Sequence, residues 1–247
     1  MLNVHLLPDL VAPSALAGRT VVVIDVLRAT TTICHALAAG AAAVVPCLEI
    51  DEARAKAAEL GRANVVLGGE RRGLKIEGFD LGNAPTEYTS ASVGGRTVVF
   101  TTTNGTRAMR HAGQAAEILI GSFANLGAVV ETLASSDEID LVCAGTGGAI
   151  TAEDALFAGA VVERLTETAI GGTRKPRELN DQARLARDAW RTLEASSSSL
   201  AAALRECQGG RNLIAEGFDA DIDTAAKIDT FDFVPRLDLK SGEITLR

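Results

Sequence analysis

The sequence predicts an α/β protein in which a mostly parallel sheet lies between two layers of helices. Three observations predict this three-layer α/β/α architecture. Short runs of Val, Ile and Leu alternate along the chain with Ala-rich stretches of helical period. The apolar runs are continuous, which is typical of strands that are covered on both faces of a sheet. The 247 residues are 47% hydrophobic, which is enough for a large core.

The expected elements follow one another in a regular order. The apolar runs predict strands at residues 21–26, 43–48, 64–67, 97–101, 117–120 and 139–143. The stretches of helical period predict helices at residues 30–40, 51–61, 105–114, 124–134, 152–169 and 178–206. The serine-rich stretch 195–203 is expected to continue the last helix, because it also contains Ala and Leu. The chain should close with a strand, a turn at Ser241–Gly242 and a second strand.

An internal repeat bears on the domain organisation. The stretch "GRTVVV" at 18–23 recurs as "GRTVVF" at 95–100, and a Thr-rich turn and an Ala-rich helix follow each copy. Duplication of a βα unit would explain the repeat, and so would two ordinary strands that share good β-formers. We expect one compact domain over residues 1–247. Duplication would divide it into two similar lobes, at about residues 1–123 and 124–247.

Composition and charge exclude several classes of partner. The net charge of −8 argues against nonspecific nucleic-acid binding, although basic groups that converge locally would still bind a small anion. The longest apolar run, at about 36–48, is too short to span a membrane, and no secretory signal is evident. The four cysteines are scattered and form no metal or disulfide pattern. We therefore expect a cytoplasmic protein, and the sequence leaves room for a homo-oligomer.

Polar residues stand at the end of the first apolar strand, where a packed core has no use for them. Asp25, Arg28, Thr30 and Thr31 follow the run that ends near residue 24. In parallel sheets, ligands bind beyond the carboxyl ends of the strands. An arginine suits phosphate or sulfonate, a carboxylate suits Mg²⁺, and threonines suit a helix N-terminus that attracts anions. The alternative is a helix cap with one solvated ion pair.

Two later turns carry similar groups. In "TTTNGT", Asn104 and Gly105 predict a tight turn whose backbone N–H groups and hydroxyls, including that of Thr106, suit an anion. Further on, Glu153 and Asp154 follow a glycine-rich loop and suit a hard cation. The alternatives are an ordinary capped βα loop and two acids that are favoured by the helix dipole alone.

A long polar loop at residues 68–88 is a further candidate, because long loops in compact domains are usually functional. It contains Glu70, Lys75, Asp80 and Asn83. Its charges could instead be solvated. Glu70 and Asp80 are the alternative metal ligands if Asp25 does not bind the metal. Since the three histidines and four cysteines share no ligand spacing, the metal expected here is Mg²⁺.

These motifs, taken in order, are similar to those of a known family. "IDVLRATTTI", "GERxGxKxxGFDxGNxPxEY", "TTTNGT" and "CAGxxGxxxxEDxxxAG" resemble the 2-phosphosulfolactate phosphatase family, and so does the segment 210–235. The resemblance covers essentially the whole chain. It implies a Mg²⁺-dependent phosphatase that converts 2-phospho-3-sulfolactate to 3-sulfolactate and phosphate, a step on a route to coenzyme M. The family pattern often has Ser after Asn83, where this chain has Ala84.

The residues and the resemblance together give the candidate site. Catalytic roles are expected for Asp25, Arg28 and Asn104. Substrate or phosphate contacts are expected for Thr30, Thr31, Lys75, Asn83, Gly105, Thr106 and Arg211. Metal ligands are expected at Asp25, Glu153 and Asp154, and Asp25 is open as either a ligand or a nucleophile. A phosphatase for a related phospho-hydroxy acid and a small-anion binding protein without turnover are the alternative functions.

Overall fold

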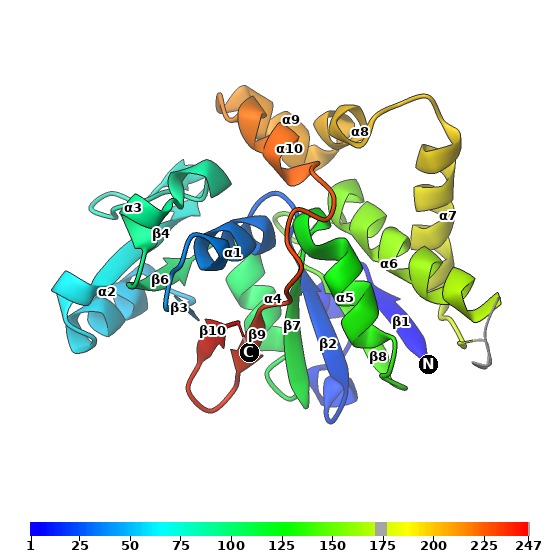
Figure 1. Cartoon of the computed structure of the whole chain (residues 1–247), viewed down its shortest axis with the longest axis horizontal. Coiled ribbons are helices and arrows are strands. Elements are labelled where there is room, and N and C mark those ends of the chain that lie inside the picture. The colour runs from blue at the N-terminus through cyan, green and yellow to red at the C-terminus, as the bar shows by residue number, and fades with distance from the viewer. Residues whose placement is uncertain (171–176, 247) are drawn as a thin grey trace.

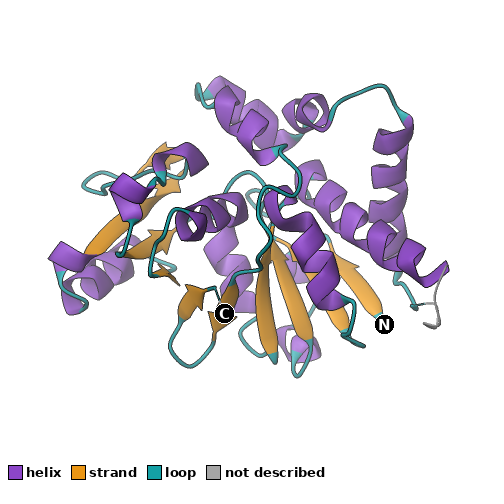
Figure 2. Ribbon diagram, in the orientation of Figure 1, coloured by secondary structure: helices purple, strands orange, loops and turns teal. Residues whose placement is uncertain are grey.

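The computed structural model describes residues 1–170 and 177–246, and it confirms the three-layer α/β/α architecture. A ten-stranded, mostly parallel sheet runs through the described residues, with helices on both of its sides (Figures 1 and 2). The strands are β1 Leu2–His5, β2 Thr20–Ile24, β3 Ala43–Pro46, β4 Val65–Arg71, β5 Leu74–Lys75, β6 Thr97–Thr101, β7 Glu117–Gly121, β8 Ile139–Cys143, β9 Arg236–Asp238 and β10 Glu243–Thr245. Their order across the sheet is β1-β8-β2-β7-β9-β10-β3-β6-β4-β5.

The expected helices are present, with one correction. The helices are α1 Ala29–Ala38, α2 Ile50–Glu59, α3 Ser90–Val93, α4 Gly105–His111, α5 Leu126–Leu133, α6 Ala152–Ile170, α7 Asp181–Ala195, α8 Leu200–Glu206, α9 Gln208–Ala215 and α10 Asp219–Ala225. Of these, α3, α9 and α10 are additional helices that the sequence pattern did not predict. The prediction of one continuous helix over residues 178–206 is wrong, because the structure has two helices there, α7 and α8, with a break between them. Serine side chains compete for backbone groups, and Ser199 instead caps α8 by accepting a hydrogen bond from the Ala202 N–H.

The sheet consists of two groups of parallel strands joined by the C-terminal hairpin. Strands β1, β8, β2 and β7 form one group, and β3, β6 and β4 form the other. The expected closing hairpin is confirmed as β9 and β10, which pair antiparallel with β7 and β3 (Figure 1, red). Residues 43–101 therefore supply one end of the sheet, and residues 2–24 and 117–143 supply the other. The division into lobes near residue 123 stays a prediction.

The repeated units cross between these two groups. The first copy runs from β2 through α1 to β3, and the second runs from β6 through α4 to β7. Each copy thus begins in one group of strands and ends in the other. Because the two crossings run in opposite directions, α1 and α4 come into contact. This crossing brings the two Thr-rich turns together.

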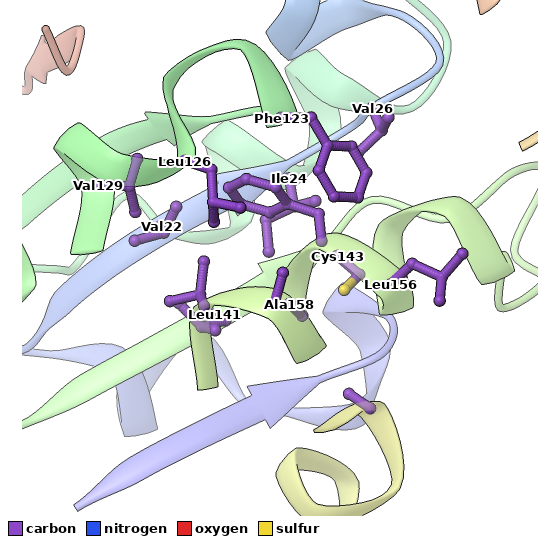
Figure 3. Packing of buried hydrophobic residues seen from close by; sticks show 14 of the residues in the cluster. Val22, Ile24, Val26, Phe123, Leu126, Val129, Leu141, Cys143, Leu156 and Ala158 are labelled. Carbon is purple, nitrogen blue, oxygen red and sulfur yellow. The ribbon is translucent and has the colours of Figure 1, made fainter. Parts of the chain in front are cut away.

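Burial explains why the strands are apolar without alternation. Val22 and Ile24 of β2 belong to an apolar cluster with Phe123 and Leu126, part of which Figure 3 shows. Val21, the neighbour of Val22, faces a second cluster formed with α1 and α4. Both faces of β2 are therefore covered, as the continuous apolar run predicts. None of the described helices has the length and apolar character needed to cross a bilayer.

Candidate active site

A cavity of about 390 Å³ lies where segments from both groups of strands meet. The segment after β2, the end of β4 and the segments after β6 and β8 all contribute to its lining, and α9 supplies the remaining wall. The lining residues are Asp25, Leu27, Arg28, Glu70, Arg72, Gly73, Asn83, Thr103, Asn104, Thr146, Gly147, Gly209, Asn212, Leu213, Ala215 and Glu216. Both Thr-rich turns open on this cavity, because Asp25 and Asn104 belong to the same lining.

Threonine hydroxyls hold the turn between β2 and α1. Thr30 Oγ1 donates to the carbonyl oxygen of Asp25 at 2.8 Å and accepts from the Asp25 N–H at 3.1 Å. Thr31 Oγ1 donates to the carbonyl oxygen of Val26 at 2.8 Å. Both threonines are buried and neither lines the cavity. The hydroxyls of Thr30 and Thr31 therefore hold the turn in shape. The direct contact with phosphate that was expected of these two residues does not fit this arrangement.

The start of α4 makes room for the Asp25 carboxylate. A Cβ at Gly105 would lie 2.8 Å from Asp25 Oδ2 and 2.6 Å from the Cβ of Ala29, so only glycine fits between the two helix starts. Thr106 Oγ1 donates to the carbonyl oxygen of Thr102 at 2.8 Å. Gly105 and Thr106 are expected to contact phosphate, but neither lines the cavity. Gly105 instead leaves space for the Asp25 carboxylate, and Thr106 holds the turn before α4.

Arg28 is buried and is held from three sides. Its Nη1 donates to Asp221 Oδ2 and its Nη2 donates to the carbonyl oxygen of Gly73, both at 2.7 Å. Its guanidinium carbon lies 4.6 Å above the ring of Phe218. Burial raises the pKa of Asp221, and the hydrogen bond from Arg28 opposes this rise. Because an arginine has five N–H groups, Arg28 keeps donors for a ligand in the cavity that it lines.

Asp221 and Phe218 are site residues that sequence reasoning missed. They belong to α10 and its N-cap, far along the chain from Arg28. In the sequence, Asp221 resembles any acid in the first turn of a helix. Only long-range packing shows that it is the partner of the buried arginine.

Glu70 connects two neighbouring segments of one strand group at the cavity wall. Its Oε1 accepts from the Thr103 N–H at 2.7 Å, and its Oε2 accepts from the Gly73 N–H at 2.8 Å. The side chain is buried and lines the cavity. Glu70 therefore fixes the β4–β5 turn against the segment that follows β6.

Burial and like charges act on the carboxylates around the cavity floor. Burial, together with the nearby Glu70 and Glu153, raises the pKa of Asp25 from 3.8 to about 7, although the hydrogen bond from Ala29 N–H opposes the rise. Burial also raises the pKa of Glu153. Burial and then the charge of Asp25 raise the pKa of Asp154 well above its usual value. Such a cluster favours a cation.

Asp25, Glu153 and Asp154 do not form the expected set of three metal ligands. Asp154 Oδ1 accepts from the Val26 N–H at 2.9 Å, and its Oδ2 accepts from the Gly145 N–H at 3.0 Å. Glu153 Oε1 accepts from the Gly209 N–H, while its Oε2 is buried without a partner. Within residues 1–170 and 177–246, no three His, Cys, Asp or Glu side chains are grouped to hold a metal. Asp154 instead ties the turns after β2 and β8 together.

Three other expected residues lie away from the cavity. Lys75 is exposed and does not line it. Arg211 is also exposed, and its guanidinium donates to Glu206 and Gln208 on its own side of the chain. Asp80 accepts from Arg62 and from the Leu67 N–H, which makes it structural. Arg72, which was not expected, lines the cavity in their place.

Two asparagines lie at the cavity as expected. Asn83 is buried and its Oδ1 has no hydrogen-bond partner, although the residue lines the cavity. Asn104 Oδ1 accepts from the Gly147 N–H at 3.2 Å, which leaves its amide N–H groups for a ligand. An unpartnered buried acceptor is costly, so Asn83 is suited to meet a donor or a cation.

Comparison with known proteins decides the family. A family model described as 2-phosphosulpholactate phosphatase matches residues 5–240. The chain belongs to the 2-phosphosulfolactate phosphatase family. It is 43% identical to the "Probable 2-phosphosulfolactate phosphatase" of Thermotoga petrophila, and the match covers 89% of each chain. It is 39% identical to the protein of the same name from Pseudothermotoga lettingae, over 95% of each chain. This is a family of phosphoric monoester hydrolases.

The charge balance of this phosphatase-family cavity is unusual for an anion site. Its lining contains three acids, Asp25, Glu70 and Glu216, and two arginines, Arg28 and Arg72. Arg28 is already neutralised by Asp221. An anionic ligand would therefore meet a net negative wall unless a further cation accompanies it.

Proposed function

We propose that this protein hydrolyses 2-phospho-3-sulfolactate to 3-sulfolactate and inorganic phosphate. We propose that this is the type of step found on a route to coenzyme M. Membership of the family and the names of its relatives support this substrate. One structural observation carries the proposal. Asp25 and Arg28, a carboxylate and a guanidinium that are both buried, line the same small cavity. A cavity of about 390 Å³ has the volume of a site for a small ligand.

We propose Mg²⁺ as the cofactor, because the proposed substrate adds three anionic groups to an already acidic cavity. The donors present suit this ion. Asp25 offers a carboxylate beside other acids, and Asn83 offers a buried amide oxygen that lacks a partner. Mg²⁺ usually binds one or two such oxygens together with water and substrate phosphate. When bound, it would supply stabilisation of negative charge on the phosphoryl oxygens.

The chain's own groups would bind and orient the ester. Arg28, held by Asp221 and Gly73, would donate its remaining N–H groups to the phosphoryl oxygens as their charge shifts in the transition state. Asn104 would donate its amide N–H groups from the opposite turn. In the reaction, water adds its oxygen to phosphorus, the ester P–O bond breaks, and a proton passes to the sulfolactate oxygen.

The test is phosphate release from 2-phospho-3-sulfolactate, with Mg²⁺, with excess EDTA and after Mg²⁺ is restored. We expect turnover that EDTA abolishes and Mg²⁺ restores. Arg107→Gln, an exposed arginine outside the cavity lining, should leave the rate unchanged. Full activity in EDTA would refute the role of the metal. Binding of the substrate without phosphate release would support the alternative of a non-catalytic anion-binding protein.

We also propose a cytoplasmic location. The four cysteines are unpaired and buried, which suits a reducing compartment. Self-association stays a prediction.

A further inference from the structure

The turn between β4 and β5 places an arginine at an unfavourable backbone position. Glu70 pairs with Lys75 and Arg71 pairs with Leu74, which leaves Arg72 and Gly73 as a two-residue hairpin loop. Both loop residues have positive φ, 54° and 83°. Hairpin loops of this kind favour Asn, Asp or Gly, because a side chain with a Cβ is strained there. Arg72 thus occupies a position that backbone preference alone would not give to arginine.

The contacts of this loop fix it at the mouth of the cavity. The carbonyl oxygen of Gly73 accepts from Arg28, and its N–H donates to Glu70. On its other side, a Cβ at Gly73 would lie 3.5 Å from the Glu216 carboxyl group, just after α9. Arg72 lines the cavity but is exposed, whereas Asp25 and Arg28 are buried. Arg72 therefore stands at the opening, and those two residues form the floor.

Arg72 also differs from Arg28 in what it binds. Arg28 is engaged by Asp221, by Gly73 and by the ring of Phe218. In the described part of the chain, Arg72 has neither an ion pair nor a hydrogen bond from its side chain. Its whole guanidinium group is therefore available to an anion that enters the cavity. A planar fork of this kind pairs two N–H groups with two oxygens of one anionic group.

We propose that Arg72 is a specificity-determining residue that binds the sulfonate of the substrate. The assignment rests on the proposed function. If the phosphoryl group lies on the floor beside Asp25 and Arg28, the rest of the substrate points toward the opening. Two anionic groups are not consumed in the reaction, the carboxylate and the sulfonate. The sulfonate sulfur is one bond farther from the phosphorus than the carboxylate carbon, so the sulfonate reaches farther toward the opening, where Arg72 stands. Its contact is the same before and during bond breaking, so it contributes binding rather than rate.

The experiment compares Arg72→Gln, Arg72→Gly and Arg72→Lys on two substrates, 2-phospho-3-sulfolactate and 2-phospholactate, which lacks the sulfonate. For the sulfonated substrate, Gln and Gly should raise KM about 10- to 100-fold with kcat nearly unchanged, and Lys should restore part of the loss. For 2-phospholactate, all four proteins should have similar KM values. Arg107→Gln is the matched control for the loss of one exposed positive charge.

Stability separates this role from a structural one. Because glycine is relaxed at positive φ, Arg72→Gly should unfold at the same temperature as the wild type or higher while it loses affinity. Equal kinetics of Arg72→Gln and wild type on the sulfonated substrate would overturn the assignment, and so would an equal loss on both substrates. A wild-type protein that releases no phosphate from either substrate would instead refute the proposed function, and this assignment with it.

Discussion

Replacing Asp25 with Asn should make the protein more stable when no metal is present. The same substitution should make the protein nearly inactive when metal is present. Asp25 is only 7% exposed, and its charge lies near those of Glu70 and Glu153. Asn keeps the shape and can still accept the hydrogen bond that the Ala29 N–H donates to Oδ1. The substitution therefore removes a buried charge and leaves the turn intact.

The size of the stability change follows from the pKa of Asp25, which burial raises from 3.8 to about 7. The unfolded chain loses the proton above pH 3.8, but the folded protein holds it up to about pH 7. The folding free energy therefore becomes less favourable as pH rises through this window. A difference of about three pH units corresponds to about 4 kcal/mol above pH 7. At pH 5 about 1.5 kcal/mol of this penalty has developed.

The assay is urea unfolding in EDTA, followed by circular dichroism at pH 8 and at pH 5. Asp25→Asn should exceed the wild type in unfolding free energy by about 2–4 kcal/mol at pH 8 and by less than half of that at pH 5. Asp9→Asn, which removes an exposed acid, is the control. A mutant that is less stable than the wild type at pH 8 would refute the reasoning.

The same variant tests the chemistry. If Asp25 holds the metal, kcat should fall at least about a hundredfold, which corresponds to about 2.7 kcal/mol in the barrier. Mg²⁺ should raise the thermal midpoint of the wild type but not that of Asp25→Asn. Near-normal turnover would show that Asp25 serves only the turn.

Three further substitutions test the supports of the site. Gly105→Ala should cost about 1–3 kcal/mol in thermal unfolding and lower phosphate release, because its Cβ would meet Asp25 Oδ2; a stabilised, active variant would contradict this. Glu70→Gln should cost about 1–3 kcal/mol, since one of its two acceptor oxygens becomes a donor that faces a backbone N–H; an unchanged thermal midpoint would argue against that pairing. Asp221→Asn should lower kcat more than it raises KM, with partial rescue by Asp221→Glu, because it loosens Arg28; wild-type kinetics would exclude a positioning role.

The fold could be predicted well because its signals are local. Apolar runs and helical periods lie within single segments, and each expected strand is present. The position of the C-terminal hairpin between β7 and β3 could not be predicted, since it depends on contacts between distant parts of the chain. The break at Ser196–Ser199 was also not predicted, because the neighbouring Ala and Leu favour a helix whereas the serines favour capping.

The site was predictable where polar residues follow strands, since Asp25, Arg28 and Asn104 all line the cavity. Asn83 lines it too, and it was predicted from the long polar loop at residues 68–88. The basic residues of the cavity were harder to predict. The hairpin at residues 70–75 determines which of its basic residues lines the cavity. The register of that hairpin cannot be read from the sequence, and in the structure it places Arg72 rather than Lys75 at the cavity. The partner of Arg28 was equally hidden, since Asp221 lies near the other end of the chain.

The two similar stretches differ at the point where they meet in the site. The first begins at Gly18 and the second at Gly95, so Thr102 takes the place of Asp25. In both copies, the carbonyl oxygen at this position accepts a hydrogen bond from a threonine hydroxyl in the following helix. The turns thus share one scaffold, and they meet where the helices cross. Two buried carboxylates at the meeting point would repel each other. The second copy instead supplies a hydroxyl and, through Gly105, the space that the Asp25 carboxylate occupies.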